Sequence, residues 1–168
     1  MGSSSENGKT RPKRKDLAIR LGVVQREAAD LDIPSLVVIE GLDGSGKGLL
    51  LNKLILEIDA RAYNIYSTHA SDERARNYPL LWRMWNDTPV RGKLQFFDRS
   101  AYYLALDSWA DGHLDEAGFD RIMDDMRRFE RQLADNGTLL VKVLLTVSRK
   151  EQARRFRKLE KNPSTAWR

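Results

Sequence analysis

The sequence predicts an α/β fold, in which a parallel sheet carries helices on both faces. Three observations lead to this prediction. An apolar, β-branched run at 35–40 is followed by a glycine-rich loop at 41–48 and then by a helix-forming run. A second apolar run, 94–97, ends in Asp98, and a third, 139–147, leads into a basic amphipathic segment. Strands that alternate with helical segments are typical of parallel sheets with helical crossovers.

The N-terminal residues differ in character from the rest of the chain. Residues 1–15 contain no apolar residue after Met1 and hold five basic residues against one acidic residue. This composition predicts a disordered basic tail. Apolar residues then recur at helical spacing, which predicts an amphipathic helix over 16–29. At 168 residues in total, 16–168 suits one domain with a sizeable core.

The composition excludes several functional classes. The chain has no cysteine and two histidines, which rules out disulfides, a cysteine nucleophile and thiolate metal sites. No apolar stretch approaches the roughly 20 residues that span a bilayer, so a cytoplasmic protein without a membrane partner is expected. The net charge is +5, but residues 16–148 hold 16 basic and 21 acidic residues, a balance of −5. Because the basic residues lie at the two ends, nucleic acid is not an expected partner.

The glycine-rich loop carries the clearest functional signal. It reads Gly-Leu-Asp-Gly-Ser-Gly-Lys-Gly and fits the phosphate-loop pattern of Gly, four residues, Gly and Lys, without the usual final Ser or Thr. Glycines allow a tight turn in which successive N–H groups and a helix N-terminus point at one anion, and lysine adds a positive charge. The alternative is a glycine-rich turn without a ligand. The predicted phosphate-binding residues are Gly41, Gly44, Ser45, Gly46, Lys47 and Gly48.

The missing hydroxyl at Gly48 has a consequence for metal binding, because that group normally helps to hold magnesium in phosphate-loop enzymes. A carboxylate inside the loop would be repelled by phosphate unless a divalent cation lay between them, so Asp43 is predicted to bind magnesium. Its alternative role is that of an ordinary turn residue. Asp98 ends an apolar strand and is followed by Arg99, a pattern that delivers a second metal-binding carboxylate beside the loop. The alternative for Asp98 is a simple strand terminus.

The remaining elements are predicted from periodicity and turn residues. A strand is expected at 63–68, and Ser71 is a candidate helix cap. Two tryptophans in an apolar helical segment at 80–85 are expected in the core. Further helices are expected at 102–109 and 119–133, the second ended by Asn136 and Gly137. The strand at 139–147 is almost continuously apolar, which predicts burial on both faces.

The last helix is predicted from a capping box of Ser148 and Glu151. Its apolar positions, Ala153, Phe156 and Leu159, are expected to face inward, whereas Arg154, Arg155 and Arg157 are expected to face outward. Basic residues on a helix usually form a solvated face. In small-molecule kinases, however, the helix at this position is a lid whose arginines neutralise the transferring phosphoryl group. Both interpretations remain open from the residues alone.

Taken together, these segments resemble the polyphosphate kinase 2 family, which includes the polyphosphate:AMP phosphotransferases. The resemblance covers nearly all of 16–168 and rests on several motifs in the correct order. They are the variant Walker A motif at 40–48, the tryptophan-arginine segment at 81–85, the Walker B motif at 97–100 with Tyr102, the late helix at 128–133 and the lid at 158–168.

The resemblance implies a P-loop kinase-like three-layer sandwich with strand order near 2-3-1-4 and a helical lid. It also implies a magnesium-dependent transfer of a terminal phosphoryl group between inorganic polyphosphate and a nucleotide, AMP or ADP, by a homo-oligomer. The catalytic residues would be Lys47, Arg99, Asp43 and Asp98, with magnesium on Asp43 and Asp98 and polyphosphate on the lid residues Arg154, Arg155 and Arg157.

The chain departs from the family pattern where the family has Trp and Arg after the Walker B motif and this sequence has Ala101 and Leu104. We also expect it to lack the C-terminal strand and helices of the family domain. These departures leave a non-catalytic polyphosphate- or nucleotide-binding domain of a two-domain phosphotransferase as one alternative. An ATP-dependent small-molecule kinase is the other, against which Gly48 argues.

Overall fold

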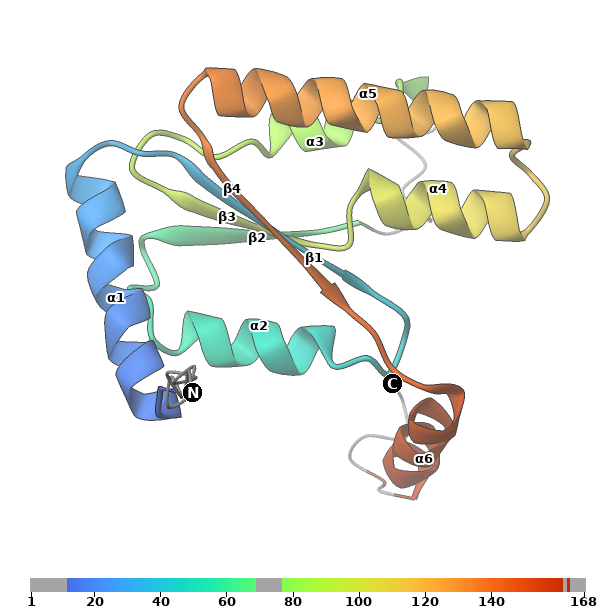
Figure 1. Ribbon diagram of the computed structural model, residues 1–168, viewed down its shortest axis with the longest axis horizontal. Helices are drawn as coiled ribbons and strands as arrows, with labels where there is room; N and C mark the ends of the chain where they lie inside the picture. Colours follow the sequence, from blue (N-terminus) through green and yellow to red (C-terminus); the bar gives the residue numbers. More distant parts are fainter. Residues whose placement is uncertain (1–11, 69–76, 162, 164–168) are drawn as a thin grey trace, which may run out of the picture.

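A computed structural model describes residues 12–68, 77–161 and 163. Within them, four parallel strands form one sheet in the order β2-β3-β1-β4, which confirms the predicted order (Figure 1). The strands are β1 (Ser35–Gly41), β2 (Tyr63–Ser67), β3 (Leu94–Asp98) and β4 (Leu139–Leu145).

Helices cover both faces of the sheet, as predicted. In Figure 1, α2 lies below the sheet and α1 runs down its left side toward α2; α3, α4 and α5 lie above the sheet, and α6 lies at the end where β1 and β4 finish. In the described part of the chain, no helix is long and apolar enough to cross a membrane. The helices are α1 (Arg14–Asp30), α2 (Lys47–Ile55), α3 (Trp82–Asn86), α4 (Ala101–Ala110), α5 (Glu116–Asp135) and α6 (Arg149–Glu160).

The first helix, predicted over 16–29, is α1 and begins two residues earlier, at Arg14. The cap expected at Ser71 lies outside the described residues. The stop after α5 is as predicted: Gly137, with φ of 83°, follows that helix in the left-handed region that favours glycine.

The core has one cluster on each face of the sheet. Successive strand residues point to opposite faces, so Phe97 packs in the cluster under α4 and α5, while Phe96 packs in the cluster under α2. Both phenylalanine side chains are at most 1% exposed.

Of the two tryptophans expected in the core, Trp85 is 42% exposed and packs edge-on against Phe129 at a ring-centroid distance of 4.6 Å. Trp82 is half-buried and stacks on Tyr78 at a ring-centroid distance of 4.2 Å. Met84 is the buried residue of this helix, so the expectation that both tryptophans lie in the core was wrong.

The prediction that β4 is buried on both faces was wrong. This strand pairs with β1 on one side and ends the described sheet on the other. Leu139 is 47% exposed and Leu144 is 71% exposed. A continuous apolar run is typical of central parallel strands, but strand position depends on pairing partners, which the run itself does not contain.

The topology brings the two predicted motifs together. β1 and β3 are neighbours, and the helices that follow them, α2 and α4, lie on opposite faces of the sheet. Such a switch point opens a crevice at the carboxyl ends of the strands, where α/β proteins bind ligands. The glycine loop after Gly41 and the turn after Asp98 both lie at this crevice.

Candidate active site

The glycine loop joins β1 to α2 through three glycines with positive φ: Gly41 at 146°, Gly44 at 75° and Gly46 at 107°. At Gly41 the restriction is also steric, since a Cβ would lie 2.3 Å from the carbonyl oxygen of Leu145. Only glycine fits there without displacing the end of β4. The loop conformation is therefore fixed by its sequence and by its contact with the neighbouring strand.

Two glycine substitutions in this loop are expected to have opposite effects on stability. Gly41→Ala should lower the free energy of unfolding by at least about 2 kcal/mol, because a Cβ would collide with backbone. Gly48 is helical and nothing lies within 4 Å of a Cβ added there, so Gly48→Ala should raise the free energy of unfolding by about 0.5–1 kcal/mol. Urea denaturation of both variants measures the effects. Equal effects at the two positions would contradict the loop geometry.

Lys47 lies in the loop as an almost buried cation, with 8% of its surface exposed. Its Nζ donates to the carbonyl oxygens of Gly41 at 2.6 Å and Leu42 at 3.2 Å, and it lies 3.7 Å from Oδ1 of Asp43. The hydroxyl of Ser45, in the same loop, is also buried and has no hydrogen-bond partner among the described residues. The loop thus holds a fixed positive charge and an unsatisfied hydroxyl at the point where phosphate is predicted.

Arg99 is brought to the loop from the end of β3. Its guanidinium donates to the carboxylate of Asp43, which is 61% exposed. The same guanidinium lies over the ring of Tyr103, 4.5 Å from the centroid. Three of the four predicted catalytic residues, Lys47, Asp43 and Arg99, therefore form one connected cluster of charges.

The backbone of Arg99 has φ of 69°, an unfavourable value for a residue with a side chain. The neighbouring structure holds it there. Its N–H donates to the carbonyl oxygen of Ile39 at 3.1 Å, and its own carbonyl oxygen accepts from the buried hydroxyl of Thr68 at 3.1 Å. Strain that is maintained by several contacts is typical of functional sites, since it fixes the direction of a side chain. Here it directs Arg99 toward the loop.

Asp98 ends β3 beside the loop, as predicted. Its Oδ1 is buried and has no hydrogen-bond partner in the described part of the chain. The carboxylate of Asp43 contacts Lys47 and Arg99, and none of its described contacts joins it to Asp98. A buried carboxylate oxygen without a donor fits a site for a cation, because leaving it unpaired costs free energy.

Glu40 is a site residue that the sequence reasoning did not identify. It is the last side chain before the glycine loop, and its Oε1 accepts from the N–H of Ser100 at 2.7 Å and from its hydroxyl at 2.6 Å. Burial raises the pKa of Glu40, and the charge of Asp98 raises it further, while the bonds from Ser100 and the charge of Lys47 lower it. The available signal was the rule applied to Asp98: a carboxylate that ends an apolar strand faces the crevice.

Replacing Glu40 should change how stability depends on pH. Because the folded pKa is raised above 4.5, the native state holds the proton more tightly than the unfolded state, and stability falls as pH rises through the window above that value. Gln resembles the neutral form. Glu40→Gln should therefore melt at a higher temperature than wild type at about pH 8, and the difference should shrink below about pH 4.5.

Thermal melting from about pH 4 to pH 8 measures this difference, and groups other than Glu40 largely cancel in the comparison. Glu57→Gln is the matched control for the loss of one carboxylate, because Glu57 lies at an exposed position beyond α2. A constant offset between Glu40→Gln and wild type across the range would contradict the prediction.

The helix α6 contacts the glycine loop, but its arginines have three different environments. Arg155 donates to the carbonyl oxygens of Gly44 and Ser45 at 2.8 and 3.0 Å. Arg154 pairs with Glu151 through two bonds of 2.7 Å. Arg157 is exposed and has no side-chain partner among the described residues. The expectation that all three face outward was therefore wrong for Arg155.

The apolar side of α6 also differs from the prediction. No residue of α6 is buried, and Ala153 is exposed. Phe156 does face the loop: a Cβ on Gly44 would lie 3.2 Å from its ring. Ser148 caps the helix as predicted, but Glu151 pairs with Arg154 and Arg155, which lower its pKa to about 2. The helix is held to the domain mainly by polar contacts.

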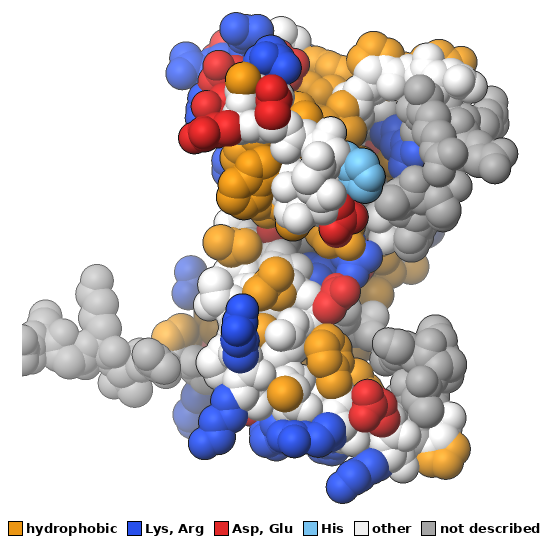
Figure 2. Space-filling model, turned by 90° about the vertical axis from the view of Figure 1, so that its right-hand side faces the viewer, with side chains coloured by type: hydrophobic (Ala, Val, Ile, Leu, Met, Phe, Trp, Pro, Cys, Tyr) orange, Lys and Arg blue, Asp and Glu red, His pale blue; other side chains and the backbone are white. Residues whose placement is uncertain are grey.

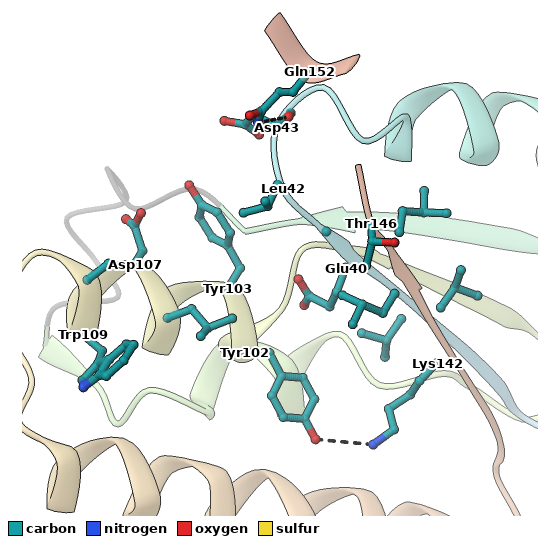
Figure 3. Close-up of a pocket in the computed structure, with 17 residues that line it drawn as sticks. Glu40, Leu42, Asp43, Tyr102, Tyr103, Asp107, Trp109, Lys142, Thr146 and Gln152 are labelled. Carbon is teal, nitrogen blue, oxygen red and sulfur yellow. Dashed lines mark hydrogen bonds between the residues drawn. The ribbon is translucent and has the colours of Figure 1, made fainter. Parts of the chain in front are cut away.

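A cleft of about 790 Å³ opens between the loop, α4 and the end of β4. Figure 3 shows Glu40 and Tyr103 pointing into it from β1 and α4, with Asp43 at its rim. Figure 2 shows the same end of the molecule as a constricted waist between α4 and α5 above and α6 below. At the far wall, Tyr102 donates to the nearly buried Glu130, which also accepts from Lys142 at 2.8 Å. A cleft of this size, next to a cationic loop, can hold a small phosphorylated molecule.

Comparison with known proteins agrees with this geometry. The family model of polyphosphate kinase 2 matches residues 3–168. The chain belongs to the polyphosphate kinase 2 family. A crystal structure of polyphosphate kinase 2 from Arthrobacter aurescens superimposes with a TM-score of 0.87 and 26% identity, over 92% of this chain and 56% of that chain. The fold is accordingly the P-loop kinase-like α/β sandwich expected from the sequence.

Two relatives of the chain are named for different nucleotide substrates. The polyphosphate:AMP phosphotransferase of Pseudomonas syringae pv. tomato is 36% identical over 75% of this chain and 25% of that protein. The ADP-polyphosphate phosphotransferase 3 of Rhizobium meliloti is 29% identical over 78% of this chain and 46% of that protein. The chain spans between a quarter and a half of the length of these relatives.

Proposed function

We propose that this protein transfers a terminal phosphoryl group between inorganic polyphosphate and a nucleoside mono- or diphosphate, AMP or ADP. The observation that carries the proposal is the convergence of Lys47, Arg99 and Asp43 on a glycine loop at the carboxyl ends of β1 and β3. Phosphoryl transfer needs little covalent chemistry from the protein. Positioning and charge neutralisation supply most of the catalysis, and this site offers both.

The loop would bind phosphate through its backbone and through Lys47. The N–H groups of Lys47, Gly48 and Leu49 precede the first hydrogen bond of α2, which runs from Leu50 to Gly46, so none has a partner within the helix. They and the helix dipole favour an anion at this point. The guanidinium of Arg99 adds a planar donor beside the phosphate.

Magnesium is the metal that we propose for this site. Magnesium is usually held by one or two carboxylates together with substrate phosphates and water. Asp98 fits because its buried Oδ1 lacks a donor, and Asp43 fits because its carboxylate is exposed at the loop. When bound there, the ion would neutralise charge on the transferring phosphoryl group. The described residues contain no cluster of three or more metal-ligating side chains, so these two would share the ion with the substrate.

The long substrate would lie along α6, whose basic residues extend from the rim of the site toward the lower end of the face in Figure 2. Arg154 and Arg157 are the arginines of the predicted lid whose side chains do not contact the loop. A linear polyphosphate carries about one charge per unit, so a basic helix next to an acidic body suits it.

Replacing both Arg154 and Arg157 with Gln should weaken long-chain polyphosphate binding and make its salt dependence shallower, by roughly 0.7 in the log–log slope per lost contact. Thermal stability should hardly change, since exposed ion pairs contribute about 0–1 kcal/mol. Affinity at several salt concentrations measures the effect. The matched control replaces Arg127 and Arg128 on α5, which are equally exposed and basic. An unaltered slope in the α6 variant would contradict the lid assignment.

Neither alternative accounts for the site as well. An ATP-dependent small-molecule kinase would use the loop hydroxyl that Gly48 lacks. A non-catalytic binding domain would not require Arg99 to be held in a strained conformation against Asp43.

The direct test is to supply AMP or ADP separately with polyphosphate and magnesium and to separate the products by chromatography. ADP formed from AMP, or ATP formed from ADP, would support the proposal, and chelation of magnesium should abolish the product. Binding of polyphosphate without any nucleotide product would favour the non-catalytic alternative. Light scattering on the same sample would test the expected homo-oligomer.

A further inference from the structure

The carbonyl oxygens of Gly41 to Gly46 in the glycine loop all accept hydrogen bonds, and most of the donors are side chains. Lys47 accounts for the carbonyl oxygens of Gly41 and Leu42, and the first turn of α2 accounts for that of Gly46. The three carbonyl oxygens between them are all bound by α6, which is more than 100 residues away in the sequence. The contact is therefore a tertiary one and not a property of the loop.

Two side chains of α6 make these bonds. The amide of Gln152 donates to the carbonyl oxygen of Asp43 at 2.6 Å. Nη1 of Arg155 donates to the carbonyl oxygens of Gly44 and Ser45 at 2.8 and 3.0 Å and lies 3.6 Å from the position of a Cβ on Gly46. Figure 3 shows Gln152 lying over Asp43 at the tip of the loop.

Arg155 is also held from its other side. Its Nε donates to Oε1 of Glu151 at 2.8 Å, so the guanidinium bridges a carboxylate of α6 and two backbone carbonyls of the loop. The ring of Phe156 packs against Gly44 next to it. A guanidinium with a fixed fork of donors can make this bridge, whereas the point charge of a lysine cannot reproduce its geometry.

We propose that Arg155 and Gln152 are positioning residues that set the direction of the loop peptides, and that Arg155 does not itself bind polyphosphate. A peptide carbonyl and the following N–H point in opposite directions, so holding the carbonyls of Asp43 and Ser45 toward α6 turns the N–H groups of Gly44 and Gly46 toward the phosphate site. The N–H of Ser45 is used within the loop, where it donates to the carbonyl oxygen of Leu42 at 3.0 Å. A cation on the carbonyl side also polarises the peptide and strengthens its N–H as a donor.

This inference divides the predicted lid into two functions. Arg155 acts through the loop, while Arg154 and Arg157 face the polymer. Its consequence for catalysis rests on the function proposed above, but its effect on the order of the loop does not, so the two can fail separately.

The first measurement is the backbone order of residues 43–48 by NMR relaxation, without any phosphate present. The backbone order parameters S² of the wild-type loop should be about 0.85, and Arg155→Gln should lower them below about 0.6. Arg149→Gln is the matched control, because it removes the same charge from an exposed position on the same helix. Gln152→Leu should loosen Asp43 and Gly44, and it carries the test if Arg155→Gln does not fold.

The second measurement is the affinity for tripolyphosphate. Arg155→Gln should weaken binding roughly 10- to 100-fold, the factor associated with one lost charge-assisted hydrogen bond, without changing the salt slope. Arg155→Lys should not restore the affinity. The proposal is overturned if the loop keeps its wild-type order in both Arg155→Gln and Gln152→Leu. It is also overturned if Arg155→Lys restores the affinity in full, because charge alone would then explain the role of Arg155.

If the loop loosens in Arg155→Gln but the wild-type protein forms no nucleotide product, the positioning inference is supported and the proposed function is not.

Discussion

Lys47→Ala is expected to lower the rate of phosphoryl transfer by at least about a hundredfold while leaving the fold intact. A charge that contacts phosphate in a partly dry site is worth about 2–4 kcal/mol in the transition state. The side chain is 8% exposed, and its ammonium is already fixed by the carbonyl oxygens of Gly41 and Leu42. Little reorganisation is therefore needed when the substrate binds.

The measurement is initial rate with polyphosphate and saturating nucleotide, together with thermal melting. Lys53→Ala is the matched control, since Lys53 is exposed in the last turn of the same helix. The loss at Lys47 should appear in kcat and not only in KM, because the developing charge is greatest in the transition state. Wild-type turnover in a folded Lys47→Ala protein would show that the loop is not catalytic.

Asp98→Asn is expected to raise the magnesium concentration needed for half-maximal activity by at least about tenfold, and Asp43→Asn by a smaller factor. The difference follows from burial. The Oδ1 atom of Asp98 is buried and without a donor, so it has most to gain from a cation, whereas Asp43 is exposed and already paired with Arg99.

Magnesium titration of the initial rate measures both effects, and isothermal titration of magnesium into the protein with bound tripolyphosphate gives a readout without turnover. Asp111→Asn is the control, because Asp111 is an exposed carboxylate at the far end of α4, the helix that follows Asp98 in the chain. Unchanged half-saturation in both the Asp43 and Asp98 variants would remove them from the metal site.

The connected cluster at the loop also bears on the departures from the family pattern. Leu104 stands where the family has an arginine soon after the Walker B motif. Arg99, which belongs to the Walker B motif itself, is stacked on Tyr103 and bonded to Asp43. The site therefore retains a guanidinium beside the loop even though one family arginine is absent. The activity assay with AMP and ADP shows whether this is sufficient.

The sequence determined the parts of this protein whose cause is local. The loop at 41–48 needs glycines for its backbone angles, and Gly41 and Gly46 are where the pattern requires them. The strand order 2-3-1-4 was expected from the family resemblance, which rests on several motifs in the correct order, and the structure has it. Asp98 was placed beside the loop because the carboxyl ends of neighbouring parallel strands lie at one edge of the sheet. Apart from the strand order, each of these follows from a few adjacent residues or from a general rule of sheet geometry.

Only the tertiary structure decided which groups meet. Arg155 and Arg157 are two positions apart on one helix, yet the first bonds to Gly44 and Ser45 and the second is exposed, because the docking of α6 sets which side of the helix faces the loop. The exposure of β4 likewise depends on what pairs with its free edge and not on its apolar residues. Glu40 acquires its raised pKa from burial and from Asp98, which lies 58 residues away along the chain (98 minus 40). Contacts across such separations carry no periodic signal in the sequence, since they arise only when the packed elements bring the residues together.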